Sequence, residues 1–280
     1  MHRTKVVFAV AILATPWLAG CHKVKARVEL KNGNALYQQE EYRQALKQFQ
    51  RGLELDPGAT FAWRSVGLTA LALYRPGDPG AENAKLGETA IEAFKKYLED
   101  YPEDGKVREY LLTTLVQAKR YDEALSYLRE HGDPNDPDTI RAQVNILIQA
   151  NRYEDAWRLA QRISGEHAPE VLYSIGVATW DQAYRNPALN YEQRGRMVDT
   201  GLQALERALR EKPDYFEAMA YYNLLFREKA KLEMDGAKRL EYIALADEWM
   251  NKALALRKKQ QEAEKKAAKA ATEADTNEGT

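Results

Sequence analysis

The sequence predicts an all-α fold made of about six consecutive helix–turn–helix units. Apolar residues recur at helical spacing, and alternating runs of β-branched residues, which are typical of strands, are almost absent. A fixed order of small, aromatic and proline residues also returns again and again through residues 26–256. Because repetition with such a period is typical of stacked helix pairs, these two observations decide the fold class.

The first unit, residues 26–59, carries the pattern most completely. Gly33 and Ala45 are small, so the two helices of the unit are expected to approach closely. Phe49 is expected to fill the gap toward the next unit, and Pro57 to end the second helix, which proline cannot continue. In order, the pattern positions are Gly33, Tyr42, Ala45, Phe49, Gly52 and Pro57.

This order closely resembles the tetratricopeptide repeat, a helix–turn–helix unit of about 34 residues. The resemblance implies a right-handed superhelical solenoid, and the phase of the pattern continues through five further, more degenerate units. The expected units are residues 26–59, 60–104, 105–137, 138–169, 170–215 and 216–256.

Three of these units, the second, fifth and sixth, are longer than the others. Their extra residues fall between the two helices, as a Gly- and Pro-rich loop within 73–88, and within 183–199 and 226–241. We expect the last of these to lengthen the helices on either side of Asp235 and Gly236. Such insertions often form a binding edge, and solvent-exposed padding is the alternative.

The N-terminal segment, residues 1–20, has the pattern of a secretory signal peptide. Arg3 and Lys5 precede an uncharged apolar stretch, residues 6–20, which is shorter than the roughly 20 residues that a membrane-spanning helix needs. The end of the stretch resembles the lipobox of bacterial lipoproteins. The matching residues are Leu18, Ala19, Gly20 and Cys21.

The lipobox resemblance implies that the sulfur of Cys21 carries a diacylglyceryl group and that the chain is cleaved just before it. Residues 21–25 would then be the lipid anchor and a short tether. Position 22 is His22 rather than Asp, which by the same resemblance favours the periplasmic side of the outer membrane. The alternatives are an ordinary signal peptide with an incidental cysteine, and an uncleaved anchor.

Composition and motifs argue against several function classes. Without residues 1–20 the chain keeps 39 basic and 42 acidic residues, so it lacks the excess of positive charge that is typical of nucleic-acid-binding proteins. It contains no glycine-rich phosphate loop, no nucleophile elbow and no pair of histidines spaced to bind a metal on one helix. We therefore expect no enzyme activity, no cofactor and no metal. Residues 257–280 are expected to extend the last helix as a polar cap and to become disordered from about Thr272.

A binding surface remains, because the first helices of tetratricopeptide units line a concave groove that holds other proteins. On the register of the repeats, Arg141, Asn145 and Gln149 share one helix face and stand beside two aromatic residues of the next first helix. Such a surface could hold an extended peptide with an acidic or C-terminal group. Alternatively, these side chains only solvate the groove or pack between repeats. The predicted groove residues are Asn34, Tyr37, Arg64, Thr113, Gln117, Arg141, Asn145, Gln149, Tyr173, Val177, Trp180, Asp181 and Arg227.

The sequence thus predicts a lipid-anchored adaptor for protein–protein interactions at the bacterial cell envelope. Its expected partners are proteins or peptides, mostly membrane-associated, and not nucleic acid. Narrower alternatives are an accessory lipoprotein of outer-membrane protein assembly or of type IV pilus biogenesis. A small-ligand-binding lipoprotein with a pocket near Trp180 is an alternative of a different class.

Overall fold

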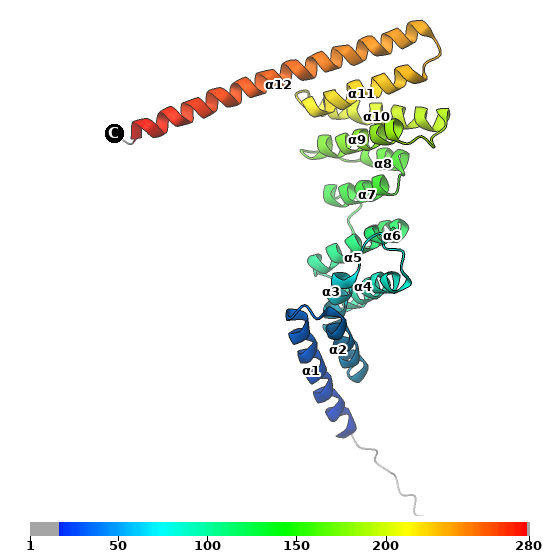
Figure 1. Ribbon diagram of the computed structural model, residues 1–280, viewed down its shortest axis with the longest axis vertical. Coiled ribbons are helices and arrows are strands. Elements are labelled where there is room, and N and C mark those ends of the chain that lie inside the picture. Colours follow the sequence, from blue (N-terminus) through cyan, green and yellow to red (C-terminus); the bar gives the residue numbers. More distant parts are fainter. Residues whose placement is uncertain (1–16, 279–280) are drawn as a thin grey trace, which may run out of the picture. The chain divides into compact units, whose positions relative to one another are not determined.

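The computed structural model describes residues 17–278, with side chains for residues 21–268 (Figure 1). Most of the predicted signal peptide, residues 1–16, lies outside the described part. Within that part the chain forms twelve α-helices and no strand, which confirms the predicted all-α fold. The helices are α1 (Trp17–Gln38), α2 (Tyr42–Leu55), α3 (Ala62–Leu73), α4 (Ala81–Asp100), α5 (Gly105–Gln117), α6 (Tyr121–His131), α7 (Pro137–Gln149), α8 (Tyr153–Ala160), α9 (Ala168–Arg185), α10 (Tyr191–Glu211), α11 (Phe216–Leu232) and α12 (Gly236–Glu278).

The chain divides into two compact units, which we call unit 1 (residues 1–120) and unit 2 (residues 121–280). Consecutive helices pack in pairs: α1 with α2 and α3 with α4 in unit 1, and α7 with α8, α9 with α10 and α11 with α12 in unit 2 (Figure 1). The division falls inside the predicted repeat of residues 105–137. Its first helix, α5, belongs to unit 1 and its second helix, α6, belongs to unit 2.

Three first helices, α1, α5 and α7, end in the same way. Each is followed by a non-glycine residue in the left-handed region, and a tyrosine begins the next helix two residues later. At the end of α1 the amide of Glu41 donates to the carbonyl of Leu36 at 2.9 Å, which is the 6→1 hydrogen bond of a Schellman motif. The left-handed residues are Glu40 (φ 62°), Lys119 (φ 58°) and Asn151 (φ 58°).

The small residues of the repeat pattern lie where two helices meet most closely. A Cβ atom on Gly33 would lie 2.7 Å from the ring of Phe49, and one on Gly67 would lie 2.4 Å from the ring of Phe94. Carbon atoms pack at about 3.5–4.0 Å, so a side chain at either position would clash. Repeats one and two therefore share one packing solution, a glycine on the first helix that receives an aromatic ring from the second.

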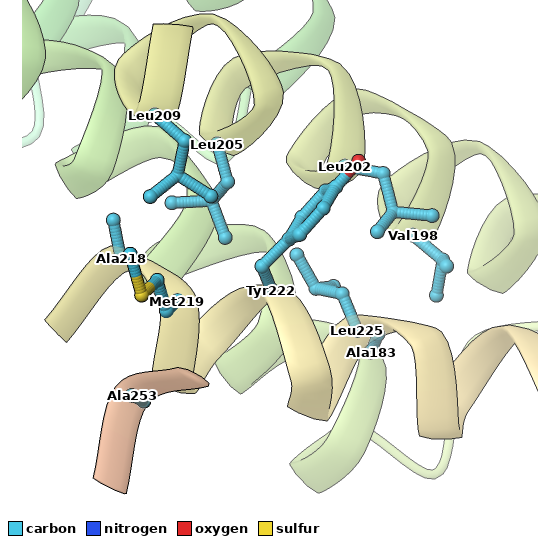
Figure 2. Close-up of a cluster of buried hydrophobic side chains, with 10 residues drawn as sticks. All are labelled: Ala183, Val198, Leu202, Leu205, Leu209, Ala218, Met219, Tyr222, Leu225 and Ala253. Carbon is cyan, nitrogen blue, oxygen red and sulfur yellow. The ribbon is translucent and has the colours of Figure 1, made fainter. Parts of the chain in front are cut away.

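The core of unit 2 draws apolar side chains from α9, α10, α11 and α12. Figure 2 shows the ring of Tyr222 on α11 directed toward Leu202 of α10. The pKa of Tyr222 is raised to about 12, because burial removes water from the phenolate. The buried residues of this core are Ala183, Val198, Leu202, Leu205, Leu209, Ala218, Met219, Tyr222, Leu225 and Ala253.

The inserted residues are partly loop and partly helix. In the second repeat, residues 74–80 form a loop, and α4 is 20 residues long. In the fifth and sixth repeats the insertions mainly lengthen helices, to 18 residues in α9, 21 in α10 and 17 in α11.

The first and last helices extend beyond the packed repeat pattern at both ends of the array. The predicted tether, residues 21–25, is part of α1, because no proline follows Trp17 within the helix and no glycine lies between Cys21 and Gly33. The disorder predicted from Thr272 stays a prediction, while α12 itself runs to Glu278. Its last part is rich in Ala, Glu and Lys, which are strong helix formers and hold a helix without an apolar face.

Candidate functional site

The predicted groove residues divide between the two units, so they are considered as two separate sets. Unit 1 holds Asn34 and Tyr37 on α1, Arg64 on α3, and Thr113 and Gln117 on α5. Unit 2 holds the larger set, on the first helices α7, α9 and α11, which contact one another in that order. Its members are Arg141, Asn145, Gln149, Tyr173, Val177, Trp180, Asp181 and Arg227.

In unit 1, two of the predicted residues make contacts that stabilise the fold. The ring of Tyr37 lies edge-on to that of Tyr42, with centroids 5.2 Å apart. Arg64 stands 3.9 Å from the carboxylate of Asp104. Burial raises the pKa of Asp104, but hydrogen bonds from the amide of Val107 and other donors outweigh it and hold the pKa below its usual value. Asn34, Thr113 and Gln117 are exposed.

In unit 2, Tyr173 and Trp180 belong to a cluster of five aromatic side chains. Trp180 stacks on Tyr184, with centroids 5.3 Å apart and ring planes 9° apart. Tyr221 on α11 meets both α9 residues edge-on, at 5.4 Å from Trp180 and 5.6 Å from Tyr173. Tyr215, at the start of α11, lies 5.1 Å from Tyr173. We call Tyr173, Trp180, Tyr184, Tyr215 and Tyr221 the aromatic cluster.

The aromatic cluster lies over the core of unit 2 and reaches solvent. Tyr173, Trp180, Tyr215 and Tyr221 are half-buried and pack against the core residues, whereas Tyr184 is 57% exposed. The pKa of Tyr215 is raised to about 12, because burial desolvates its phenolate and because Tyr173, Glu170 and Glu217 lie nearby. Tyr215 is therefore a neutral hydroxyl at physiological pH.

Two lysines place positive charge against the rings of the aromatic cluster. The ammonium of Lys212 lies 4.5 Å from the ring centre of Tyr215 and 3.2 Å from the carboxylate of Glu170. The ammonium of Lys231 lies 5.3 Å from the ring centre of Tyr184 and 2.6 Å from the carboxylate of the buried Glu228. The rings are thus an apolar surface with cations at hand, which suits a ligand that has both an apolar part and an acidic part.

The polar row on α7 is exposed on the helix that neighbours α9. Arg141, Asn145 and Gln149 follow one another at intervals of four residues, so they share one face. Arg141 is ion-paired with Asp138 at 2.8 Å, and both side chains are largely exposed. Exposed pairs contribute only about 0–1 kcal/mol, so Arg141 can exchange Asp138 for the carboxylate of a partner.

Asp181 and Arg227 are engaged in other interactions. Asp181 pairs with Arg185 one turn further along α9, at 2.8 Å. Arg227 donates to Asn223 at 3.0 Å and pairs with Asp247 of α12 at 2.7 Å. Among the described residues, no hydrogen bond or ring contact joins Arg227 to the aromatic cluster.

Sequence reasoning missed three members of the cluster. Tyr184 could have been found, because it continues the spacing of Tyr173, Val177 and Trp180 along one face of α9. Tyr221 could also have been found, since it directly precedes the buried Tyr222, as groove residues do in the predicted register. Tyr215 precedes α11, and no helix periodicity marks it.

The structure also bears on the other predicted sites. Cys21 is exposed on α1, while part of the predicted signal peptide lies outside residues 17–278. Across that described range, no helix combines the length and the apolar character that a bilayer span requires. Nor do the described side chains include a group of three or more His, Cys, Asp or Glu residues that could hold a metal. A cavity of about 570 Å³ lies in unit 1 between α2, α3 and α4, against Trp63. The small-ligand alternative predicted a pocket near Trp180, which belongs to unit 2.

The sequence and structure were compared with known proteins. The tetratricopeptide repeat family profile matches residues 30–80 and 87–137. Among curated proteins, no sequence match was found. Among solved structures, YrrB, described as a tetratricopeptide protein with an unusual peptide-binding site, is 20% identical, with 68% of this chain and 88% of that chain covered and a TM-score of 0.40.

Two further solved structures show the same level of likeness. A tetratricopeptide protein from Bacteroides fragilis is 14% identical, with 71% of this chain and 97% of that chain covered and a TM-score of 0.44. PilF of Pseudomonas aeruginosa is 17% identical, with 80% and 99% covered and a TM-score of 0.34. The profile match and the twelve helices of the described residues together show that this chain has an all-α fold with tetratricopeptide repeats.

Proposed function

We propose that this chain is a membrane-anchored adaptor that binds segments of other proteins on the first helices of unit 2. The observation that carries the proposal is the aromatic cluster, whose rings leave the core of unit 2 and reach solvent on α9 and α11. Large aromatic side chains dominate the energy of protein interfaces, because they bury much apolar area with few rotatable bonds.

The charges around the cluster favour a partner segment with an acidic or C-terminal carboxylate. Lys212 and Lys231 stand against the rings, and Arg141 with Asn145 and Gln149 forms a polar row on the neighbouring helix α7. An extended peptide would place apolar side chains on the rings, while a carboxylate meets a guanidinium or an ammonium.

The membrane part of the proposal rests on the lipobox resemblance of Leu18 to Cys21 at an exposed cysteine. An acyl chain contributes about 0.8 kcal/mol per buried methylene, so several chains on Cys21 would anchor the protein firmly. Because residues 21–25 are helical, the distance along the helix axis from Cys21 to the packed residue Ala26 is only about 7.5 Å. A surface held this close suits partners that are embedded in, or docked on, the same membrane.

The binding surface is tested by capturing partners from cells that express the intact protein or a triple variant. Arg141→Glu, Asn145→Ala and Tyr184→Ala change only exposed side chains, so the melting temperature should stay the same while captured partners are lost. The matched control is Arg158→Glu, which also reverses an exposed charge, on the second helix α8. Equal capture by the triple variant and the intact protein would exclude this surface.

The anchor is tested separately, by metabolic labelling with a clickable fatty acid. Cys21→Ala should abolish labelling and leave the signal peptide attached, because the thiol is the acyl acceptor. Equal labelling of the variant and the natural chain would refute the lipid anchor and leave the proposal for the aromatic cluster untouched.

A further inference from the structure

Helix α1 has an exposed apolar strip on the side that does not pack on α2. Ala26 and Leu30 are buried, and they meet α2 at Gly52. Val24 and Val28 are 62% and 54% exposed, although valine side chains gain free energy from burial. Together with Cys21 they stand at i, i+3 and i+7, which places all three on one face of the helix.

Basic side chains surround this strip. Lys23, Lys25, Arg27 and Lys31 are all exposed, and none of the four forms an ion pair with a described residue. The only acidic residue of α1, Glu29, is 3.4 Å from Arg51 of α2 and is therefore compensated. The helix thus combines a narrow apolar strip with a dense, uncompensated positive charge.

We infer that this outer face of α1, with Val24 and Val28 at its centre and Lys25, Arg27 and Lys31 beside them, lies in the headgroup region of an anionic bilayer. A helix with an apolar strip and a basic border lies in the plane of the membrane interface, where its apolar side chains enter the acyl boundary and its cations meet lipid phosphates. Because the positive charge beside the strip is uncompensated, we expect this face to bind an anionic lipid surface. Cys21 lies on the same face, so its acyl chains would enter that surface.

This inference deepens the proposed function and rests on it, because the anchor on Cys21 would hold the face at the membrane. It adds an orientation: α1 lies along the bilayer, with Ala26 and Leu30 turned away from the lipid toward α2. The acyl chains would then fix one point, and the outer face of α1 would fix how unit 1 is turned relative to the membrane.

The test uses residues 21–280 with Cys21→Ser, a chain that corresponds to the processed protein but cannot be acylated. Its folding is verified by circular dichroism, and its binding to phosphatidylcholine vesicles is measured by sedimentation with and without phosphatidylglycerol. We expect binding at least about tenfold stronger when phosphatidylglycerol is present. Val24→Ser with Val28→Ser should weaken it about tenfold, and Lys25→Glu with Arg27→Glu should remove it.

The matched control is Leu240→Ser with Leu254→Ser on α12, which changes two leucines that are 67% and 57% exposed and should leave binding unchanged. Equal binding to both kinds of vesicle, or equal binding by the Val24/Val28 variant and its parent, would overturn the inference. The fatty-acid labelling of Cys21 is independent of this measurement. If the protein is labelled but does not bind vesicles, only the orientation of α1 is refuted. If the protein binds vesicles but is not labelled, only the lipid anchor is refuted.

Discussion

At the scale of single residues, the register of the repeats can be tested at Ala45 and its neighbour. Ala45 is completely buried in the second helix of repeat one, whereas Gln44 is exposed. Ala45→Trp should lower the free energy of unfolding by about 1–3 kcal/mol or more, because added volume forces packed side chains and backbone to shift. Gln44→Trp should change it by less than about 0.5 kcal/mol.

The measurement is the thermal melting of residues 21–280 carrying either substitution. Equal melting temperatures for Ala45→Trp and Gln44→Trp would mean that the register of repeat one is wrong.

Single residues also show how far the site could be predicted. The half-buried Tyr173 and Trp180 followed from the register, because one helix face carries both. Tyr215 could not be predicted, since it precedes α11 and reaches the cluster through the path of the chain between α10 and α11. The ion pair of Arg227 could not be predicted either, because its partner Asp247 lies on α12. Helix periodicity shows which residues share a face, but not which other helix that face contacts.

At the scale of elements, the inserted loop of repeat two depends on one side chain. Asn83 of α4 is 8% exposed, accepts a hydrogen bond from the amide of Arg75 at 2.7 Å, and donates to the carbonyls of Arg75 and Asp78 at 2.8 and 2.9 Å. Asn83→Ala should lower the free energy of unfolding by about 1–3 kcal/mol, because it leaves these backbone groups unsatisfied.

The loop prediction is measured by thermal melting and by amide hydrogen exchange of residues 74–80, which should lose protection. Asn32→Ala, an exposed position on α1, is the matched control and should change neither. Unchanged protection in Asn83→Ala would show that the loop is held by other contacts.

The elements themselves were largely predictable, but some of their ends were not. Glycines, aromatic residues and prolines mark where repeats one and two pack and where their helices stop. The extents of α1 and α12 could not be read from that pattern, because the pattern records packing between helices. Residues 21–25 continue α1 beyond its packed residues Ala26 and Leu30, and the end of α12 is helical through intrinsic propensity, without an apolar face that repeats.

At the scale of the whole molecule, the sequence predicts one continuous array, whereas the chain divides into two compact units between Arg120 and Tyr121. The division falls between α5 and α6, the two helices of the repeat of residues 105–137, although the repeat pattern keeps its phase through this point. The spacing of small and aromatic residues therefore predicts where the helices lie, but it carries no signal for how extensively two consecutive helices contact each other.

The central claim is that the aromatic cluster is the surface on which this protein binds other proteins. It is tested most directly by placing a photo-crosslinking amino acid at position 184 of the intact protein and irradiating living cells. Tyr184 is 57% exposed, so the replacement leaves the core intact, and position 158 on α8, which is also exposed, is the matched control. We predict discrete crosslinked proteins, mostly membrane-associated, from position 184 and none of them from position 158. Identical crosslinked proteins from both positions, or none from position 184, would contradict the claim.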